Sequence, residues 1–151
     1  MSLHFHYKLQ AFNRPLISLG GRFSRPRPIV SVTVIGPTRG RPIDCLIDTG
    51  SDDTVFSEDL AHQIGVDLTQ APQGSGGGAG ATALPLRYAE VTLRLADRHE
   101  QREWRAWVGF TSVKLRRPLL GFASFLQFFT ATFHGDREEV ELAVNSLYPG
   151  T

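Results

Sequence analysis

A run of apolar residues that stops at an acid constrains this chain more than any other part of its sequence. Residues 43–55 read Ile-Asp-Cys-Leu-Ile-Asp-Thr-Gly-Ser-Asp-Asp-Thr-Val. The consecutive apolar residues 45–47 leave no face for solvent, which is typical of a buried strand. A carboxylate at the end of such a strand is costly to bury unless hydrogen bonds or a shared charge compensate it. The pattern therefore predicts that Asp48 is presented for proton chemistry by a turn at Thr49 and Gly50.

The residues around Asp48 resemble a known family. Residues 48–51 (Asp-Thr-Gly-Ser), with Asp-Asp-Thr-Val after them, are similar to the active-site turn of aspartic proteases, and most similar to the retroviral-type, single-motif branch. A second landmark of that family, two apolar residues and a glycine before a short helix, is matched by residues 119–121 (Leu-Leu-Gly) and 122–126. The resemblance covers residues 28–144. It implies that the protein is an aspartic-type peptidase and a bacterial-style member of this branch. It also implies an all-β fold, a retropepsin-like closed barrel with one or two short helices.

The resemblance also implies a mechanism. Aspartic-protease chemistry needs two neighbouring carboxylates that share one proton, because both cannot ionise side by side. One carboxylate activates a water as general base, while the protonated one polarises the scissile carbonyl. The chain contains one Asp-Thr-Gly and is too short for a two-motif enzyme. The expectation is therefore a homodimer that hydrolyses peptide or protein substrates at its twofold axis.

Family positions assign roles to residues of this turn. Asp48 corresponds to the catalytic acid, and Thr49 to the threonine that bonds across the dimer. Gly50 corresponds to the glycine whose carbonyl meets the substrate. Asp52 corresponds to the residue that anchors the substrate backbone, with Asp53 as its neighbour. The expected catalytic group is thus Asp48, Thr49 and Gly50, and the expected substrate contacts are Ser51, Asp52 and Asp53.

Two positions depart from the retroviral pattern. Retroviral members have, after the downstream glycine, an arginine that pairs with the acid at the position of Asp52, and here Phe122 stands there. Asp52 then needs another partner, or the dimer is weaker. Ser51 stands where retroviral enzymes usually have alanine. A hydroxyl that donates to the neighbouring carboxylate favours its ionised form, which predicts an activity optimum on the acid side for the coupled pair.

Residues 74–80 form the second informative stretch, Gly-Ser-Gly-Gly-Gly-Ala-Gly. A phosphate-binding loop needs such a glycine turn between a strand and a helix, but residues 82–95 alternate as a strand, so the context excludes a dinucleotide site. In aspartic proteases the chain forms a mobile β-hairpin flap here, in which glycines supply hinge freedom. We therefore expect Gly76, Gly77 and Gly78 to contact substrate. A flexible linker is the alternative interpretation.

The remaining pattern predicts many short strands, which is typical of an all-β, barrel-like domain. Strands are expected at residues 4–9, 29–35, 42–47, 54–56, 82–95, 103–110 and 128–133, with a last strand around 140–144. Short helices are expected at residues 57–64 and 122–127, and an irregular connection at residues 10–27. The expected organisation is an N-terminal strand and irregular basic arm (1–27), a protease domain (28–146) and a tail (147–151).

The cysteine content indicates a reducing compartment. Cys45 is the only cysteine, so no internal disulfide forms. The chain begins without the apolar run of a signal peptide, and its most apolar stretch, residues 119–133, is too short to span a membrane. A cytoplasmic protein is therefore expected. His4 and His6 share a strand face, but two ligands without a third make a weak metal site, so neither metal nor cofactor is expected.

Two functions other than peptide hydrolysis are possible for this chain, one suggested by its charge and one by its fold. Residues 1–41 carry seven bases and no acid, a net charge of +7, whereas the remainder carries nine bases against fifteen acids, a net charge of −6. A basic leading segment is a candidate nucleic-acid binder. A solvated loop, or docking on the chain's own acidic part, explains it better and disfavours nucleic acid as a partner. The second alternative is a catalytically weak, protease-like dimerisation or peptide-binding module.

Overall fold

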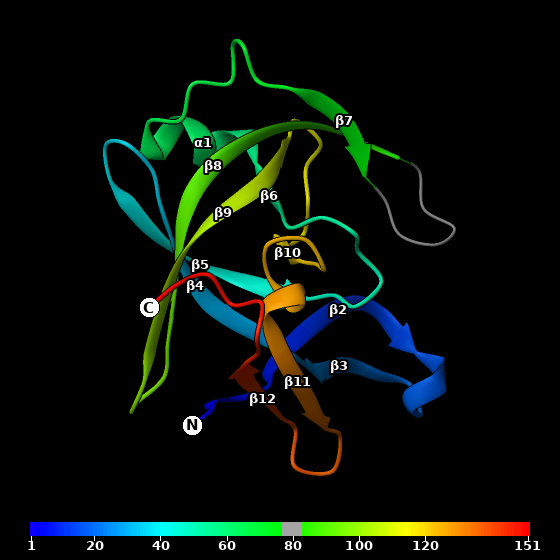
Figure 1. The fold of residues 1–151 in the computed structure, drawn as a ribbon. Helices are drawn as coiled ribbons and strands as arrows, with labels where there is room; N and C mark the ends of the chain where they lie inside the picture. The colour runs from blue at the N-terminus through cyan, green and yellow to red at the C-terminus, as the bar shows by residue number, and fades with distance from the viewer. Residues whose placement is uncertain (77–82) are drawn as a thin grey trace.

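The computed structural model describes residues 1–76 and 83–151, most of which lie in strands (Figure 1). The elements are β1 (Leu3–His6), β2 (Lys8–Leu16), η1 (Ile17–Leu19), β3 (Arg22–Arg27), β4 (Ile29–Ile35), β5 (Gly40–Ile47), β6 (Val55–Ser57), α1 (Glu58–Ile64), β7 (Gln73–Gly76), β8 (Leu84–Ala96), β9 (Gln101–Thr111), β10 (Leu119–Leu120), η2 (Leu126–Phe128), β11 (Phe129–His134) and β12 (Glu139–Val144). The predicted all-β class is confirmed. In the described ranges, no helix is long and apolar enough to cross a membrane.

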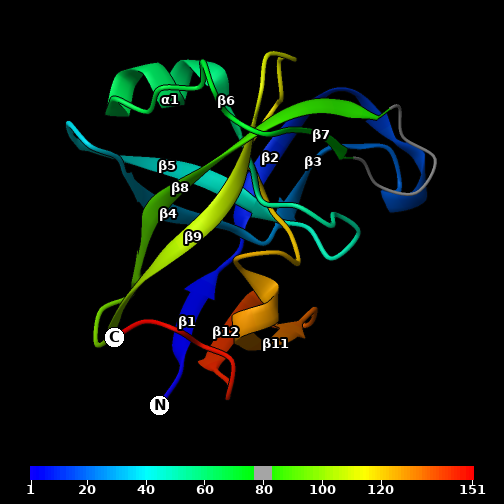
Figure 2. The same cartoon turned by 45° about the horizontal axis from the view of Figure 1, so that its top comes forward.

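A seven-stranded sheet forms the body of the molecule, in the order β4-β5-β10-β6-β9-β8-β7. Because β4 also pairs with β8, the pairings lead back to the first strand and leave β7 outside the ring. A separate three-stranded sheet has the order β1-β12-β11. Figures 1 and 2 show α1 at one end of the seven-stranded sheet and the three-stranded sheet at the opposite end.

Alternating strand residues build the core. On β4 the three valines at 30, 32 and 34 are at most 1% exposed. On β9 the predicted face of Trp104, Ala106, Val108 and Phe110 is buried as well. These positions follow the two-residue period of a strand, so the sequence pattern is sufficient to place them inside.

Helix α1 has the predicted ends. The Ser57 hydroxyl accepts a hydrogen bond from the Leu60 N–H at 3.3 Å, and two acids follow in the first turn. Gly65 ends the helix in the left-handed conformation, with φ of 82°. A hydroxyl cap at the start and a glycine at the end satisfy main-chain groups that a helix leaves unpaired.

The expectation of an irregular connection over residues 10–27 is wrong, because β2 and β3 pair there as an antiparallel hairpin. Its turn runs through η1 and through Gly20 and Gly21, whose φ angles are 71° and 84°. Prolines suggested irregularity, but among residues 1–76 and 83–151 strands β2 and β3 pair only with each other, and edge strands tolerate proline. The expected strand at 4–9 is likewise divided: β1 ends at His6, and Leu9 of β2 is 67% exposed.

The expected helix at residues 122–127 is also absent. Residues 122–125 form turns, and the single 3₁₀ turn η2 follows. Ser124 lies in the left-handed region, with φ of 66°, so a right-handed helix cannot pass through it. Its hydroxyl accepts from the Trp107 N–H at 3.0 Å and donates to the Trp107 carbonyl at 2.8 Å. These bonds to β9 hold the segment in a non-helical path.

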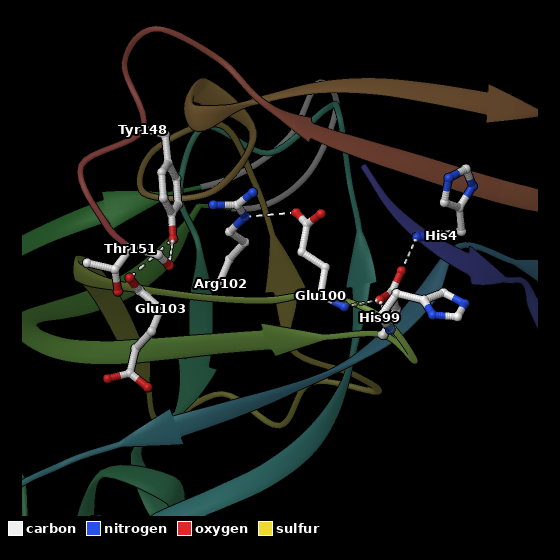
Figure 3. A network of polar contacts seen from close by, with 8 residues as sticks. His4, His99, Glu100, Arg102, Glu103, Tyr148 and Thr151 are labelled. Atoms are coloured by element: carbon white, nitrogen blue, oxygen red, sulfur yellow. Dashed lines mark hydrogen bonds and ion pairs between the residues drawn. The ribbon is translucent and has the colours of Figure 1, made fainter. Parts of the chain in front are cut away.

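Both ends of the chain are fastened to the β8–β9 hairpin (Figure 3). The Asp97 carboxylate accepts from the His4 N–H at 2.9 Å. The Tyr148 hydroxyl donates to the Glu103 carbonyl at 3.1 Å, and the Thr151 N–H donates to the same carbonyl at 3.0 Å. The terminal segments are therefore part of the folded body.

Candidate active site

Asp48 follows directly on strand β5, as predicted, but of residues 45–47 only Cys45 and Ile47 are buried and Leu46 is half-buried. The Gly50 N–H donates to Asp48 Oδ1 at 2.9 Å, and the Ser51 N–H donates to the Asp48 carbonyl at 3.2 Å. Thr49 and Gly50 are exposed, and Asp48 itself is half-buried. The turn therefore fixes the carboxylate through main-chain hydrogen bonds while leaving it accessible to a ligand.

The Leu-Leu-Gly segment lies beside this turn. Strand β10 pairs in parallel with β5, with Leu119 opposite Leu46 and Leu120 opposite Ile47. The Asp48 N–H donates to the Leu120 carbonyl at 3.0 Å. Two sequence landmarks that are far apart in the chain are thus adjacent strands of one sheet.

Main-chain contacts lock the two loops together. The Phe122 N–H donates to the Ser51 carbonyl at 2.9 Å, and the Ala123 N–H donates to the Asp52 carbonyl at 2.9 Å. A Cβ on Gly121 would lie 2.6 Å from the Ser51 carbonyl oxygen and closer still to that of Asp53. Only glycine fits at position 121 without a shift of the main chain.

Thr54 ties the same loops together through its side chain, and sequence reasoning missed this role. Its hydroxyl donates to the Ala123 carbonyl at 2.7 Å and accepts from the Gly121 N–H at 3.3 Å. Thr54 is 1% exposed, and its own carbonyl accepts from the Gly109 N–H at 2.9 Å. The sequence did contain a signal for this role, since Thr54 stands next to the apolar pair Val55 and Phe56. A threonine buried with them needs hydrogen-bond partners for its hydroxyl.

Replacing Thr54 with valine should lower the free energy of unfolding by about 2–4 kcal/mol, because two buried main-chain groups lose their partner. Thr54→Ser keeps the hydroxyl and serves as the matched control, with a smaller loss. Urea unfolding of the three proteins measures the difference. Equal midpoints for Thr54→Val and the wild type would contradict the bridging role.

Ser51 does not act as predicted. Its hydroxyl donates to the Asp53 carbonyl at 2.7 Å and not to the Asp48 carboxylate. Ser51 is 6% exposed, and its side chain points into the protein, where this carbonyl needs a donor. The expectation that Ser51 favours ionisation of Asp48 is therefore wrong, and the acid-side optimum stays a prediction without that support.

Phe122, at the position of the family arginine, is 59% exposed. The Asp52 side chain is exposed too, and in ranges 1–76 and 83–151 its carboxylate has no hydrogen-bond or ion-pair partner. The main-chain bonds of residues 122 and 123 hold the loop without the arginine.

Of the two neighbouring acids Asp52 and Asp53, Asp53 is the one whose carboxylate has a hydrogen-bond partner among the described residues. Its Oδ1 accepts from the Tyr88 hydroxyl at 3.2 Å, and the Tyr88 ring stacks on Trp107 at 6.2 Å between centroids. Burial raises the pKa of Asp53 and the nearby Asp52 adds to this, while the Tyr88 hydrogen bond acts in the opposite direction. The net result is a raised pKa, so the fold favours the protonated form of this carboxyl.

The raised pKa of Asp53 predicts how stability depends on pH. A folded-state pKa above the usual 3.8 stabilises the protein at low pH, and this contribution is lost as pH rises through the folded-state value. Asp53→Asn should therefore gain stability relative to the wild type as pH rises from 3 to 7. Urea midpoints across that range test this, with the exposed Asp136→Asn as control. A stability difference that does not change with pH would contradict it.

Of the three glycines expected to contact substrate, Gly76 lies within the described residues and Gly77 and Gly78 lie outside them. Gly76 ends β7 and pairs with Leu84 of β8. A Cβ at Gly76 would lie 2.9 Å from Asp53 Oδ2 and 2.7 Å from a methyl of Leu86. The structure thus brings the end of β7 against the acid that Tyr88 holds.

A strand that ends in Asp-Thr-Gly beside a Leu-Leu-Gly segment, within an all-β fold, defines the retropepsin-like class of aspartic peptidase. A comparison with family models agrees: the model described as aspartyl protease matches residues 30–122. That match spans more than half of the chain, so the chain belongs to the aspartyl protease family and is an aspartic-type peptidase, a hydrolase. Neither the curated proteins nor the solved structures contain a match to it.

Proposed function

We propose that this protein is an aspartic endopeptidase that acts as a homodimer, with one Asp48 from each subunit in a shared dyad. The observation that carries the proposal is the single accessible Asp48, held by Gly50 on a turn whose exposed face includes Thr49. One carboxylate cannot serve as base and acid in the same step, and a twofold axis through this turn supplies the second.

In the proposed mechanism the two carboxylates share one proton. The ionised Asp48 takes a proton from water as the water oxygen attacks the scissile carbonyl, while the protonated Asp48 donates to the carbonyl oxygen. The resulting gem-diol collapses when one of its hydroxyls returns a proton to the now ionised Asp48 and the C–N bond breaks. The leaving nitrogen takes the proton that the other Asp48 received from water, so the dyad again holds one proton. We assign Thr49 to the hydrogen bonds between the two turns, because its side chain is exposed beside Asp48.

We propose that substrate lies between this turn and the β7–β8 hairpin. Gly76 lies against Asp53, which supports a role for the hairpin as a flap over this turn. Gly77 and Gly78 continue the chain from that point and are proposed substrate contacts. Gly50, Ser51, Asp52 and Asp53 form the opposite side in this proposal, through their main-chain atoms and the two carboxylates.

We further propose that residues 28–146 form the catalytic domain and that residues 147–151 are a tail that packs on its β8–β9 hairpin. Residues 1–27 precede the domain in the chain, as β1, which pairs with β12 of the domain, and the β2–β3 hairpin. Cys45 is free and buried, and burial raises the pKa of its thiol. Its lack of a partner supports a reducing, cytoplasmic compartment.

Cleavage of an unbiased peptide library at pH 4–7 tests the proposed function, together with sedimentation of the same sample. We expect cleavage by a dimer, and inhibition by a compound that mimics the tetrahedral intermediate. A folded dimer that cleaves no peptide would overturn the endopeptidase assignment, and an active monomer would overturn the shared dyad.

A further inference from the structure

The β2–β3 hairpin leaves the body of the molecule beside Asp48. Its second strand ends at Arg27, and the carbonyl of the next residue, Pro28, accepts from the Ile47 N–H at 2.9 Å. Ile47 is the last residue before Asp48. The base of the hairpin therefore lies next to the carboxylate of the proposed dyad, and a twofold axis through that dyad passes close to it.

The hairpin extends away from this base. Figures 1 and 2 both show β2, η1 and β3 projecting from the body on the same side as the loop between β5 and β6. The nine residues of β2 span about 30 Å when extended. An arm of that length, which starts beside the twofold axis and projects on the side of the shared site, would reach the second subunit.

The hairpin also exposes large apolar side chains. Ile17 is 81% exposed and Phe23 is 57% exposed, and Leu9 and Leu19 are exposed as well. Within residues 1–76 and 83–151, no other stretch as long as residues 9–23 exposes as many. Apolar side chains that gather on one projecting element are typical of an interaction surface.

Charge favours a second copy of this chain as the partner. The loop of residues 48–54, which presents Asp48, carries three acids and no base. The hairpin carries five bases and no acid, namely Lys8, Arg14, Arg22, Arg25 and Arg27. In a twofold dimer, arms that faced each other would repel, and so would the two loops. Opposite charges meet in both halves when each arm faces the loop of the other subunit.

Contacts with the body fix the direction of the arm. Arg116 donates to the Ala11 carbonyl, and its guanidinium lies 4.8 Å from the centre of the Phe12 ring. Lys8 pairs with Asp44 of β5 at 2.8 Å. These contacts attach the first half of β2 to β5 and to the segment before β10, whereas the apolar residues of the hairpin tip (residues 16–23) remain exposed.

We propose that the β2–β3 hairpin is a dimerisation arm that packs its apolar tip on the second subunit and thereby holds the two Asp48 turns together. This inference rests on the proposed homodimeric peptidase. A stable interface buries about 800 Å² on each partner, and the exposed Thr49 and Gly50 of the turn supply only a small part of that area. The arm then controls activity, because separated subunits each carry half of the dyad.

Analytical ultracentrifugation of tip variants tests the arm. Ile17→Asp and Phe23→Asp should each raise the Kd of the dimer by about 10- to 100-fold, since a charge replaces a side chain that the partner buries. Peptide cleavage near the wild-type Kd should fall in parallel and recover at high protein concentration. Leu147→Asp, at an exposed position of the tail, is the matched control and should keep the wild-type Kd. Urea midpoints should stay unchanged in all three variants, because each alters an exposed side chain.

A charge reversal tests the second half of the argument. Arg14→Glu on the hairpin should raise the Kd of the dimer, and the effect should shrink at high salt, because the bases of the arm face acids of the partner. Arg98→Glu, an exposed arginine between β8 and β9, is the matched control and should leave the Kd unchanged.

A photo-crosslink at the tip locates the contact directly. Cys45 is buried, so a benzophenone maleimide should label only the new thiol of Ser18→Cys in the folded protein. In dimers mixed from unlabelled and ¹⁵N-labelled subunits, illumination should join the tip to the other subunit, seen as crosslinked peptides of mixed isotope content. Ser146→Cys in the tail is the matched control and should crosslink within its own subunit. Crosslinks from position 18 that stay within one subunit would overturn the arm.

The outcomes separate the arm from the proposed function. A wild-type dimer whose Kd is unchanged in both tip variants would overturn the arm and leave the shared dyad intact. A dimer that cleaves no peptide would overturn the endopeptidase assignment, while the tip variants still test the arm. A wild type that stays monomeric would overturn both. Oligonucleotide binding that Arg14→Glu loses while its dimer Kd is unchanged would assign the hairpin to nucleic acid and overturn the arm.

Discussion

Asp48→Asn is expected to lower kcat/KM for peptide cleavage by at least about 10⁴-fold, because an amide cannot accept the proton that the attacking water loses. The fold should be retained, since the asparagine oxygen can still accept the Gly50 N–H that now bonds Asp48 Oδ1. Kinetics on a peptide found in the library screen, together with thermal unfolding, measure both. The exposed Asp136→Asn is the control and should keep full activity and stability.

Mixing wild type with Asp48→Asn tests whether the dyad is shared between subunits. If each site needs Asp48 from both subunits, activity in re-equilibrated mixtures should fall with the square of the wild-type fraction, because mixed dimers are inactive. If each subunit acted alone, activity would fall in direct proportion to that fraction. A linear decrease would therefore contradict the shared site even if Asp48→Asn alone is inactive.

Gly121→Ala is expected to destabilise the protein by at least about 3 kcal/mol, at the upper end of what overpacking costs. The added methyl would collide with the Ser51 and Asp53 carbonyls, which belong to the main chain and cannot rotate away as a flexible side chain can. Relief would require the Leu-Leu-Gly segment to separate from the Asp48 turn. Urea unfolding measures the stability, and peptide cleavage reports the loss of the site.

Gly135→Ala is the matched control for this variant. Gly135 lies in the turn between β11 and β12, its φ is not positive, and an added Cβ would meet no atom within 4 Å. Its effect should stay within about 0.5 kcal/mol, as for most surface substitutions. Unfolding midpoints for Gly121→Ala and Gly135→Ala that coincide would show that the close packing at Gly121 is not needed for the fold.

Local patterns were enough to predict the parts of the fold that depend on periodicity and turn chemistry. The valines of β4, the buried face of β9 and the ends of α1 all follow from residue order alone. The Asp48 turn and the Leu-Leu-Gly segment were also predicted, because an acid after an apolar strand and a glycine after two leucines are local signals. Their adjacency was not predicted, because it is a contact between residues far apart in the chain.

The features that sequence reasoning missed depend on contacts between distant residues. The non-helical path at Ser124 results from hydrogen bonds to Trp107, and no local pattern names that partner. The direction of the Ser51 hydroxyl was likewise decided by the Asp53 carbonyl. The β2–β3 hairpin was missed because its prolines and glycines have the same composition as an irregular loop.

The attachment of the loop at Phe122 has a consequence for how such chains vary. Its bonds to the Asp48 turn come from the N–H groups of residues 122 and 123, and almost any residue other than proline provides an N–H. The side chain at position 122 is therefore not needed to hold the loop and can be substituted. Thr54 and Gly121 cannot be substituted in this way. A search pattern for chains of this type should require the threonine and the glycine and accept any residue except proline at the next position.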